Sequence, residues 1–479
     1  MTKHHYTHSS GLLDQYQHAA PVRPANTRTC GPRLPMFLIF GIVPNGGFLR
    51  DNSEGIQISS YPRSSPLSIS PTTTMKTLTS ALLGAAALAQ NVKSSPLSGA
   101  AGLEFPNVTG LANPTVHVSN GGSAHCVSGT VKVNATTDKN LKFAYNLPSN
   151  QSQVTQTLVS LWSSGGDGYL KSLTNGTQRV SGSYDIEATY CLPAGETSKT
   201  TKVQILTHGI GVDRHYWDFA SGYSYVDTAA AAGYATFLYN RLGVGASSKE
   251  DPLNVVQSPL ELEILKTLAS KLRQGTLGDR AFSTVVGVGH SFGSILTQGV
   301  TAAYPKTLDA AVLTGFALDS NGLPGFGLGL NAAIASETQP YRFSGLSAGY
   351  LVAGTSVSNQ IAFFYDPGFD PEILSLADAT KGSFTLGELF TLTHVVNATS
   401  EFQGPVAVVA GNEDLPFCNG NCSSPTNILA GLVPALYPGL SEANTATYVA
   451  PVAGHALNLH YAAPGAFDFI QDFLKKHNV

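Results

Sequence analysis

Hydrophobic and polar positions follow two different periods from about residue 184 to the end of the chain. Short apolar runs rich in β-branched residues are typical of buried strands, and they occur in SYDIEATYCL, KVQILTHG, ATFLYNRLG, TVVGVGH, DAAVLTGFA, PVAVVAGNED and TATYVAPVAGH. Several of these runs are followed by apolar residues at helical spacing. Because strands and helices alternate, the pattern predicts an α/β fold with a mostly parallel central sheet covered by helices on both faces.

Two predicted helices have distinct signals at their ends. The sequence SPLE at 258–261 is a capping-box pattern with proline at the first helical position, so it predicts the start of a helix. The final stretch PGAFDFIQDFLKKH predicts a second helix, whose lysines near the C-terminal end interact favourably with the helix dipole.

One long stretch, from about residue 319 to 399, interrupts the alternation. It contains GLPGFGLGLNAAIA and QIAFFYDPGF, which are apolar but poorly periodic. A loop with one or two packed helices is one interpretation. We favour the other, a cap insertion that excludes water from an active site and lines a substrate pocket.

The first part of the chain has a different composition. Residues 1–74 show no sustained period and include the Ser/Pro/Thr-rich stretch SSYPRSSPLSISPTTT, which predicts disorder. The stretch MKTLTSALLGAAALAQ, which begins at Met75, combines a lysine, an apolar run and a small-residue cleavage site. A short buried helix is the alternative, but we favour a signal peptide at 75–89. Met75 is then the true start, and residues 1–74 are an upstream extension.

Polar and turn residues dominate the next segment, with short alternating runs such as TVKVNAT. This composition predicts a small N-terminal segment of β or irregular structure at 90–183, ahead of an α/β domain at 184–479.

Sequons and cysteines both favour export. Six N-x-S/T sequons begin at Asn107, Asn134, Asn150, Asn175, Asn397 and Asn421. Apart from Cys30, the cysteines form the even set Cys126, Cys191, Cys418 and Cys422. An even number fits disulfides formed in an oxidising compartment. We therefore expect a secreted, extracellular glycoprotein.

The spacing of the cysteines indicates how they pair. Cys418 and Cys422 are close enough to form a local bridge, which would leave Cys126 to pair with Cys191. Only His125 stands beside any of these cysteines, so a metal site is a poor alternative.

The composition narrows the choice of partners. Charged residues make up only 12% of the 479 residues, and the net charge is −4 without a basic run. Nucleic acid is therefore not an expected partner. No apolar stretch after the first hundred residues is long enough for a transmembrane segment, and MFLIFGIV at 36–43 is too short. The sequence does not indicate an oligomeric state.

The motif GHSFG places Ser291 between a predicted strand and a predicted helix. A serine on such a sharp turn presents its hydroxyl above the sheet, and Gly289 and Gly293 leave room for the close approach of strand and helix. The amides at the start of the helix would face whatever reacts at the serine. A glycine-rich turn with an incidental serine is the alternative. A matching acid and base elsewhere in the sequence distinguish the two interpretations.

A nucleophilic serine needs a general base, and the base needs an orienting acid. In hydrolases with the serine on such a turn, the acid follows a late strand and the histidine comes last. After VVAG, the chain offers Glu413 and Asp414, and we choose Asp414 for its place in G-x-x-D. After the last strand it offers His455 and His460, and we choose His455 because Gly454 precedes it at the strand end. Ser291, Asp414 and His455 are the predicted catalytic residues.

An oxyanion hole requires backbone amides that are fixed before charge develops. We expect one from Phe292, which follows the serine. The other should come from the turn HGIG at 208–211, at Ile210 or at Gly211 beside it. His208 and His290 flank the site, and we interpret both as structural.

These motifs together, LTHGIG, YNRLGVGAS, GHSFGS, VVAGNEDLPF and PVAGHALNLH, resemble the α/β-hydrolase superfamily, and most closely its secreted fungal esterase- and lipase-like members. The resemblance covers about residues 184–479. In YNRLGVGAS, Asn240 stands near the acid of the family's D-x-R-G-x-G-x-S loop and Arg241 is kept; we interpret this loop as structural.

The resemblance implies a serine hydrolase that cleaves small-molecule carboxylic esters through an acyl-enzyme on Ser291, without a metal or organic cofactor. The apolar insertion favours esters with an apolar part. The alternatives are an acyltransferase or cofactor-free perhydrolase with the same triad, and a non-catalytic binding protein on a hydrolase scaffold.

Overall fold

The computed structural model of the chain describes residues 105–195 and 200–479. The upstream extension with Cys30, the signal peptide and the start at Met75 all lie outside the described residues, and their predictions stay predictions.

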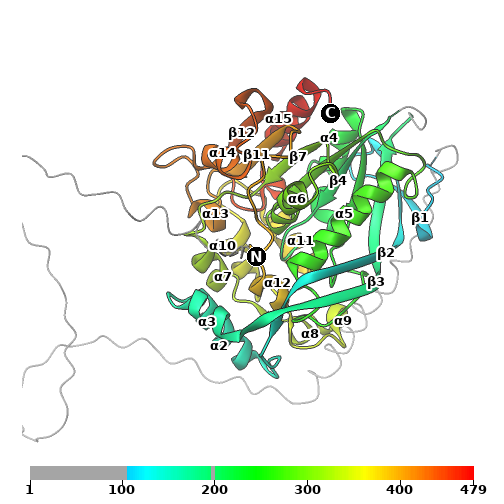
Figure 1. Cartoon of the computed structure of the whole chain (residues 1–479). Helices are drawn as coiled ribbons and strands as arrows, with labels where there is room; N and C mark the ends of the chain where they lie inside the picture. Colours follow the sequence, from blue (N-terminus) through cyan, green and yellow to red (C-terminus); the bar gives the residue numbers. More distant parts are fainter. Residues whose placement is uncertain (1–104, 196–199) are drawn as a thin grey trace, which may run out of the picture. The chain divides into compact units, whose positions relative to one another are not determined.

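The centre of the described part is a nine-stranded sheet in the order β1-β2-β3-β5-β4-β6-β7-β11-β12 (Figure 1). Its strands are β1 Ala112–Val118, β2 Ala124–Phe143, β3 Thr174–Pro193, β4 Lys202–Thr207, β5 Ala235–Tyr239, β6 Thr284–His290, β7 Ala310–Thr314, β11 Val406–Gly411 and β12 Thr445–Ala450. β5, β4, β6, β7, β11 and β12 pair in parallel, and β1, β2 and β3 add antiparallel neighbours. The prediction of a mostly parallel central sheet is confirmed.

Helices cover both faces of the sheet (Figure 1). α5 Ser258–Gln274 and α6 Phe292–Ala303 pack together on one face, and α4 Tyr225–Ala231 and α15 Ala463–Lys476 pack on the other. Every residue of β5, β7 and β11 is buried, which explains why these strands are continuous apolar runs. The shorter helices outside the insertion are α13 Leu415–Cys418, α14 Leu432–Leu436 and the 3₁₀ turns η1 Arg214–Trp217, η2 Ile428–Gly431, η3 Glu442–Asn444 and η4 Leu457–Leu459.

The capping box expected at 258–261 does not form. α5 begins at Ser258 with Gln257 as its N-cap, and no side chain caps it. The Ser258 hydroxyl donates instead to the carbonyl oxygen of Thr391 at 2.6 Å, and Glu261 binds the buried side chain of Arg241. Ser258 and Glu261 therefore bind partners far away in the sequence instead of capping the helix.

The N-terminal segment extends the central sheet, and the boundary expected between residues 183 and 184 falls inside β3. β2 and β3 form a long antiparallel arm that carries α2 Gln151–Trp162 and α3 Gly166–Leu173. α2 packs against α7 of the insertion, where a methyl group on Gly327 would collide with the ring of Trp162. The arm thus supports the insertion from outside.

The stretch at 319–399 is more regular than its sequence indicated. It contains the helices α7 Leu323–Gly329, α8 Ala335–Thr338, α9 Pro340–Phe343, α10 Ser356–Phe363, α11 Pro371–Thr380 and α12 Leu386–Phe390. Its strands β8 Ala333–Ile334, β9 Tyr350–Val352 and β10 Phe384–Thr385 form a separate antiparallel sheet.

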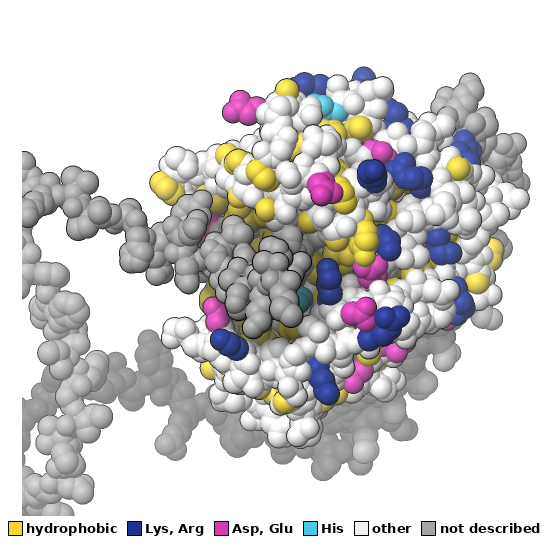
Figure 2. All heavy atoms as spheres, viewed as in Figure 1, with side chains coloured by type: hydrophobic (Ala, Val, Ile, Leu, Met, Phe, Trp, Pro, Cys, Tyr) yellow, Lys and Arg dark blue, Asp and Glu magenta, His cyan; other side chains and the backbone are white. Residues whose placement is uncertain are grey.

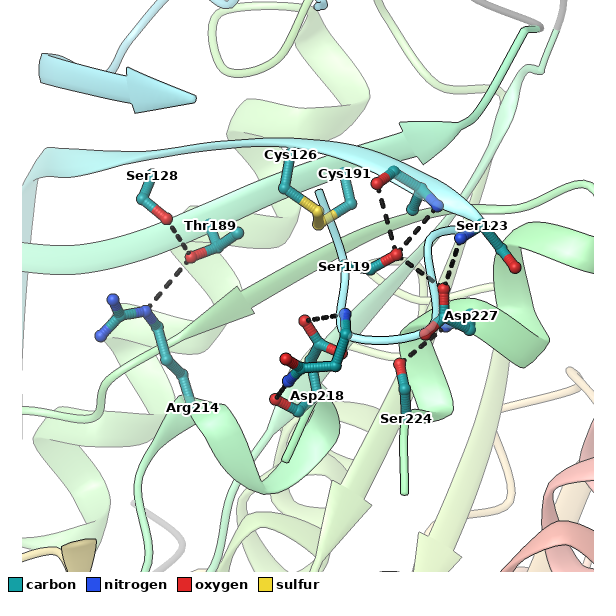
Figure 3. The surroundings of a disulfide bond; sticks show 12 residues. Ser119, Ser123, Cys126, Ser128, Thr189, Cys191, Arg214, Asp218, Ser224 and Asp227 are labelled. Atoms are coloured by element: carbon teal, nitrogen blue, oxygen red, sulfur yellow. Dashed lines mark hydrogen bonds between the residues drawn. A yellow bond between two sulfur atoms is a disulfide. The ribbon is translucent and has the colours of Figure 1, made fainter. Parts of the chain in front are cut away.

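The four cysteines of the described residues form two disulfides, Cys126–Cys191 and Cys418–Cys422. Cys126 and Cys191 face each other across β2 and β3. Beside them, Asp227 of α4 accepts hydrogen bonds from Ser119 Oγ at 2.6 Å and from the amide of Ser123 at 2.7 Å (Figure 3). These contacts attach the turn between β1 and β2 to the main domain.

The surface carries charges of both signs. On the face drawn in Figure 2, basic and acidic side chains are interspersed with hydrophobic ones. Among the described residues, no helix combines the length and the apolar composition that crossing a membrane requires.

Candidate active site

Ser291 occupies a strained turn between β6 and α6. Its φ and ψ are 56° and −119°, a conformation that non-glycine residues rarely adopt and that costs roughly 1–3 kcal/mol. The Ser291 amide donates to the carbonyl oxygen of Thr314 at 2.8 Å, which holds the turn in place. Methyl groups on Gly289 or Gly293 would collide with backbone atoms, so this close packing requires both glycines.

The three predicted catalytic residues converge at one edge of the sheet. Ser291, Asp414 and His455 follow β6, β11 and β12, and the carboxyl ends of these parallel strands lie at the same edge. His455 Nε2 lies 2.8 Å from Ser291 Oγ, and His455 Nδ1 lies 2.6 Å from Asp414 Oδ2. Because a carboxylate only accepts, Nδ1–H donates to Asp414 and Nε2 accepts from the serine hydroxyl.

All three side chains are protected from solvent. Ser291 is 8% exposed, His455 1% and Asp414 0%. Asp414 is also the N-cap of α13, and its Oδ1 accepts from the amide of Phe417 at 3.0 Å. This second hydrogen bond orients the carboxylate toward the imidazole.

The alternative acid and base have other partners. Glu413 Oε2 accepts from the amide of Ala453 at 2.9 Å and so supports the histidine loop from outside. His460 Nε2 accepts from the amides of Gly454 and Tyr365, which connects the histidine loop to the insertion. Burial lowers the pKa of His460 to about 4, so this ring stays neutral at ordinary pH.

His208 and His290 are buried beside the site without reaching the serine hydroxyl. Burial, together with the charge of Arg241, lowers the pKa of His208 to about 3. Burial also lowers the pKa of His290 well below its usual range, and its ring stacks on Tyr216 with centroids 4.4 Å apart. Both rings act as neutral packing and hydrogen-bonding groups.

The two expected oxyanion amides lie on segments that touch each other. A methyl group on Gly209 would lie 2.9 Å from Cβ of Ser291, so the turn at 208–211 packs against the nucleophile. In the described part of the chain, the amides of Ile210 and Phe292 donate no hydrogen bond. Amides without an acceptor beside a nucleophile are what an oxyanion hole requires. Gly211 lies next to Ile210 with φ +79°, and its carbonyl accepts from the amide of Gly382 in the insertion.

Aromatic residues of the insertion close the site above His455. Phe363 of α10 stacks on the imidazole with centroids 6.0 Å apart, and Phe326 of α7 meets it edge-on at 5.7 Å. Phe417 adds a third ring at 5.8 Å. The sequence indicated a cap but neither Phe326 nor Phe363, because the insertion lacks the periodicity that assigns a face. The apolar stretches GLPGFGLGL and QIAFFYDPGF were the available signal.

A model of the "Alpha/beta hydrolase family" matches residues 204–467, more than half of the chain. The chain belongs to the α/β-hydrolase family. Its central sheet with flanking helices is the α/β-hydrolase fold. A comparison with curated proteins found no match.

Solved structures with a similar fold share little sequence with this α/β-hydrolase. A thermophilic esterase from Thermogutta terrifontis is 14% identical to this chain with a TM-score of 0.43. The superposition covers 62% of this chain and 95% of the esterase. A soluble variant of monoglyceride lipase from Saccharomyces cerevisiae is 14% identical with a TM-score of 0.42, covering 61% and 92%. The α/β hydrolase GrgF from Penicillium sp. sh18 is 17% identical with a TM-score of 0.41, covering 61% and 94%.

Proposed function

We propose that this α/β-hydrolase is a secreted serine hydrolase that cleaves carboxylic esters with an apolar part. The observation that carries the proposal is the continuous hydrogen-bond chain from Ser291 through His455 to Asp414. A serine on a strained turn, an imidazole nitrogen 2.8 Å from its hydroxyl and a buried carboxyl group behind that imidazole are the parts that acyl transfer to water needs.

In the first half of the reaction, Ser291 Oγ forms a bond to the ester carbonyl carbon while His455 Nε2 takes its proton. The carbonyl π electrons move onto oxygen, where the amides of Ile210 and Phe292 stabilise the charge. The carbon–alkoxide bond then breaks, and His455 gives the proton to the departing alcohol. A water molecule then attacks the acyl-enzyme carbonyl carbon while His455 takes its proton. The bond to Ser291 Oγ breaks, His455 returns the proton to Oγ, and the carboxylic acid is released. Asp414 holds the imidazole in the tautomer that each step requires.

The surroundings of His455 support an apolar substrate. Phe326, Phe363 and Phe417 place hydrophobic surface next to the reacting atoms. Rings at these positions also exclude water, which strengthens the electrostatic stabilisation of the oxyanion. Charged alcohol or acyl groups would lose their hydration here without compensation.

Two features support export. The four cysteines after the predicted signal peptide are paired in disulfides, which persist in oxidising compartments. All six sequon asparagines are exposed, at positions 107, 134, 150, 175, 397 and 421. Expression from Met75 in a fungal host tests the localisation, because we expect protein in the medium that an endoglycosidase shifts to lower mass. Unmodified protein retained inside the cells would contradict it.

The activity is tested with the parent enzyme and the Ser291→Ala variant on p-nitrophenyl esters from acetyl to palmitoyl. We expect the variant to lose about a millionfold in kcat. A fluorophosphonate probe should label the parent and leave the variant unlabelled. Cys30 and the upstream extension are absent from both proteins, so neither affects the comparison.

Product analysis separates hydrolysis from the alternatives. Free acid as the main product in the presence of added alcohol or peroxide supports a hydrolase. Predominant new ester or peracid would indicate an acyltransferase or a perhydrolase. A folded parent that neither turns over esters nor reacts with the probe would favour a binding protein.

A further inference from the structure

Arg241 is a charged residue in the core, and its side chain binds the turn that follows β4. It is 1% exposed. Its Nε donates to the carbonyl oxygen of His208 at 3.1 Å, and its Nη2 donates to that of Gly209 at 3.2 Å. Its own amide donates to His208 Nε2 at 3.1 Å. One residue therefore holds two successive carbonyl groups of the turn that carries Ile210.

The carbonyl group of Gly209 belongs to the same peptide unit as the amide of Ile210. In a planar trans peptide the N–H points away from the carbonyl oxygen, so binding the oxygen fixes the direction of the N–H. The oxygen of Gly209 also faces His208 Nδ1 at 2.9 Å, which donates because a carbonyl oxygen only accepts. Two donors on this oxygen, one of them cationic, polarise the peptide and make the Ile210 amide a stronger donor.

The same guanidinium group contacts the other half of the proposed oxyanion hole. Its central carbon lies 4.7 Å from the centroid of the Phe292 ring. Phe292 follows Ser291 directly, and its ring is 1% exposed. Arg241 thus touches both segments whose free amides flank the nucleophile.

Two buried carboxylates hold the guanidinium group in this position. Arg241 Nη1 donates to both oxygens of Glu261, at 3.1 and 3.2 Å, and to Glu388 Oε1. Glu261 comes from α5 and Glu388 from α12 of the insertion. Glu388 Oε2 accepts from the amide of Thr385 at 2.6 Å, which completes a capping box and fixes the carboxylate. Burial raises the pKa of Glu261 well above its usual range, although the charge of Arg241 opposes this shift.

We propose that Arg241 is a positioning residue for the oxyanion hole: it fixes and polarises the peptide between Gly209 and Ile210 so that the Ile210 amide faces the developing negative charge. The sequence pattern indicated only a structural loop at this position. The inference rests on the proposed function, since an oxyanion forms only if Ser291 attacks a carbonyl group. The negative charge develops only in the transition state, so substitution of Arg241 should change kcat rather than KM.

The test compares Arg241→Lys with the parent. Lysine keeps the positive charge beside Glu261 and Glu388, but its single ammonium group cannot reproduce the guanidinium fork that reaches both carbonyl groups. We expect kcat to fall roughly tenfold to a hundredfold, less than the roughly 10²–10³ for deleting a whole donor, with KM changed by less than about threefold. Active sites are counted with the fluorophosphonate probe, so that misfolded protein does not enter kcat.

A trifluoromethyl ketone supplies the readout that a merely structural role would not change. Its carbonyl carbon binds Ser291 Oγ reversibly, the proton passes to His455, and the oxygen becomes an anion in the oxyanion hole. We expect its affinity to fall by the same factor as kcat. Arg214→Lys is the matched control, because Arg214 is also buried and paired with a glutamate, Glu187 at 2.7 Å, but its Nε donates to Thr189 and not to a carbonyl group of the turn at 208–211 (Figure 3).

A second variant removes the whole buried charge cluster by combining Arg241→Met, Glu261→Gln and Glu388→Gln. Removing all three charges together leaves no uncompensated buried charge, whereas removing one member of the cluster does. Parent-like kcat and ketone affinity in either folded variant would overturn the proposal, and so would an equal loss in Arg214→Lys. Failure of the proposed function is a different result, because the parent itself would then lack Ser291-dependent turnover.

Discussion

The ring of Phe363 lies nearly parallel to the imidazole of His455, with an angle of 19° between their planes. Phe363 ends α10 in the insertion, whereas His455 follows the last strand of the central sheet. The backbone joins the same two segments, because the amide of Ala456 donates to the carbonyl oxygen of Phe363 at 2.8 Å. The insertion is therefore packed directly onto the proposed general base.

This stacking predicts that Phe363 limits the size of the substrate. In Phe363→Leu, we expect the ratio of kcat/KM for long to short p-nitrophenyl esters to rise about tenfold, because volume opens beside His455. Phe402→Leu is the control, since Phe402 is equally buried and packs on Tyr437. An unchanged chain-length profile in Phe363→Leu, or the same change in both variants, would contradict the prediction.

Substitutions that remove only the charge of a side chain distinguish the proposed acid, Asp414, from its neighbour Glu413. Asp414→Asn keeps the shape of the side chain but cannot hold His455 in the required tautomer, so we expect kcat to fall by about 10⁴-fold. Glu413→Gln should lose less than about tenfold, because the Glu413 carboxylate accepts from the amide of Ala453 and from the side chain of Asn412 and not from His455. Steady-state kinetics with one short ester decides between them. A larger loss in Glu413→Gln would move the acid to that residue.

The buried histidines predict a loss of stability in acid. His208 and His460, with pKa values lowered to about 3 and about 4, stay neutral when folded, but they bind protons near pH 6.5 when unfolded. Between pH 6.5 and about 4 the unfolded state therefore binds more protons, and the free energy of unfolding falls as the pH falls. Each histidine contributes up to about 1.4 kcal/mol per pH unit.

Urea unfolding at intervals of half a pH unit measures this slope. His460→Gln should flatten it, because the glutamine oxygen can accept from one of the same amides without taking up a proton. A stability that is independent of pH over this range in the parent would contradict the prediction.

The two disulfides should differ in their contributions to stability. Cys126–Cys191 closes a loop with a sequence separation of 65, and Cys418–Cys422 one of 4. From loop-closure entropy, replacing the first pair by serines costs about 4 kcal/mol and the second about 2 kcal/mol. Denaturant titrations of both double variants measure the difference. A greater loss from the short loop would show that native-state contacts, and not the unfolded chain, determine these contributions.

The sequence predicted the central fold well because strands buried on both faces must be continuously apolar. β6 and β11 are examples, and Ser291 and Asp414 follow them at the positions expected from the motifs. The pattern was less informative for the insertion and for 90–183. There, packing surfaces come from distant segments, as with Trp162 against Gly327. A local period cannot indicate such partners.

The capping sequence at 258–261 shows the same limit on a smaller scale. Ser258 and Glu261 fit a local hydrogen-bond pattern, but Thr391 and Arg241 provide tertiary partners that replace it. A true capping box forms instead at Thr385 and Glu388.

By itself, the sequence determined the order of strands and helices in the central sheet region, the turn at Ser291 and the candidates for acid and base, since these depend on local periodicity and on glycine at close approaches. Only the tertiary structure decided that Asp414 and His455 meet Ser291, that Phe363 covers the imidazole and that Arg241 binds the turn at 208–211. These are contacts between residues far apart in the chain, and they exist only once the sheet has brought its strand ends to one edge.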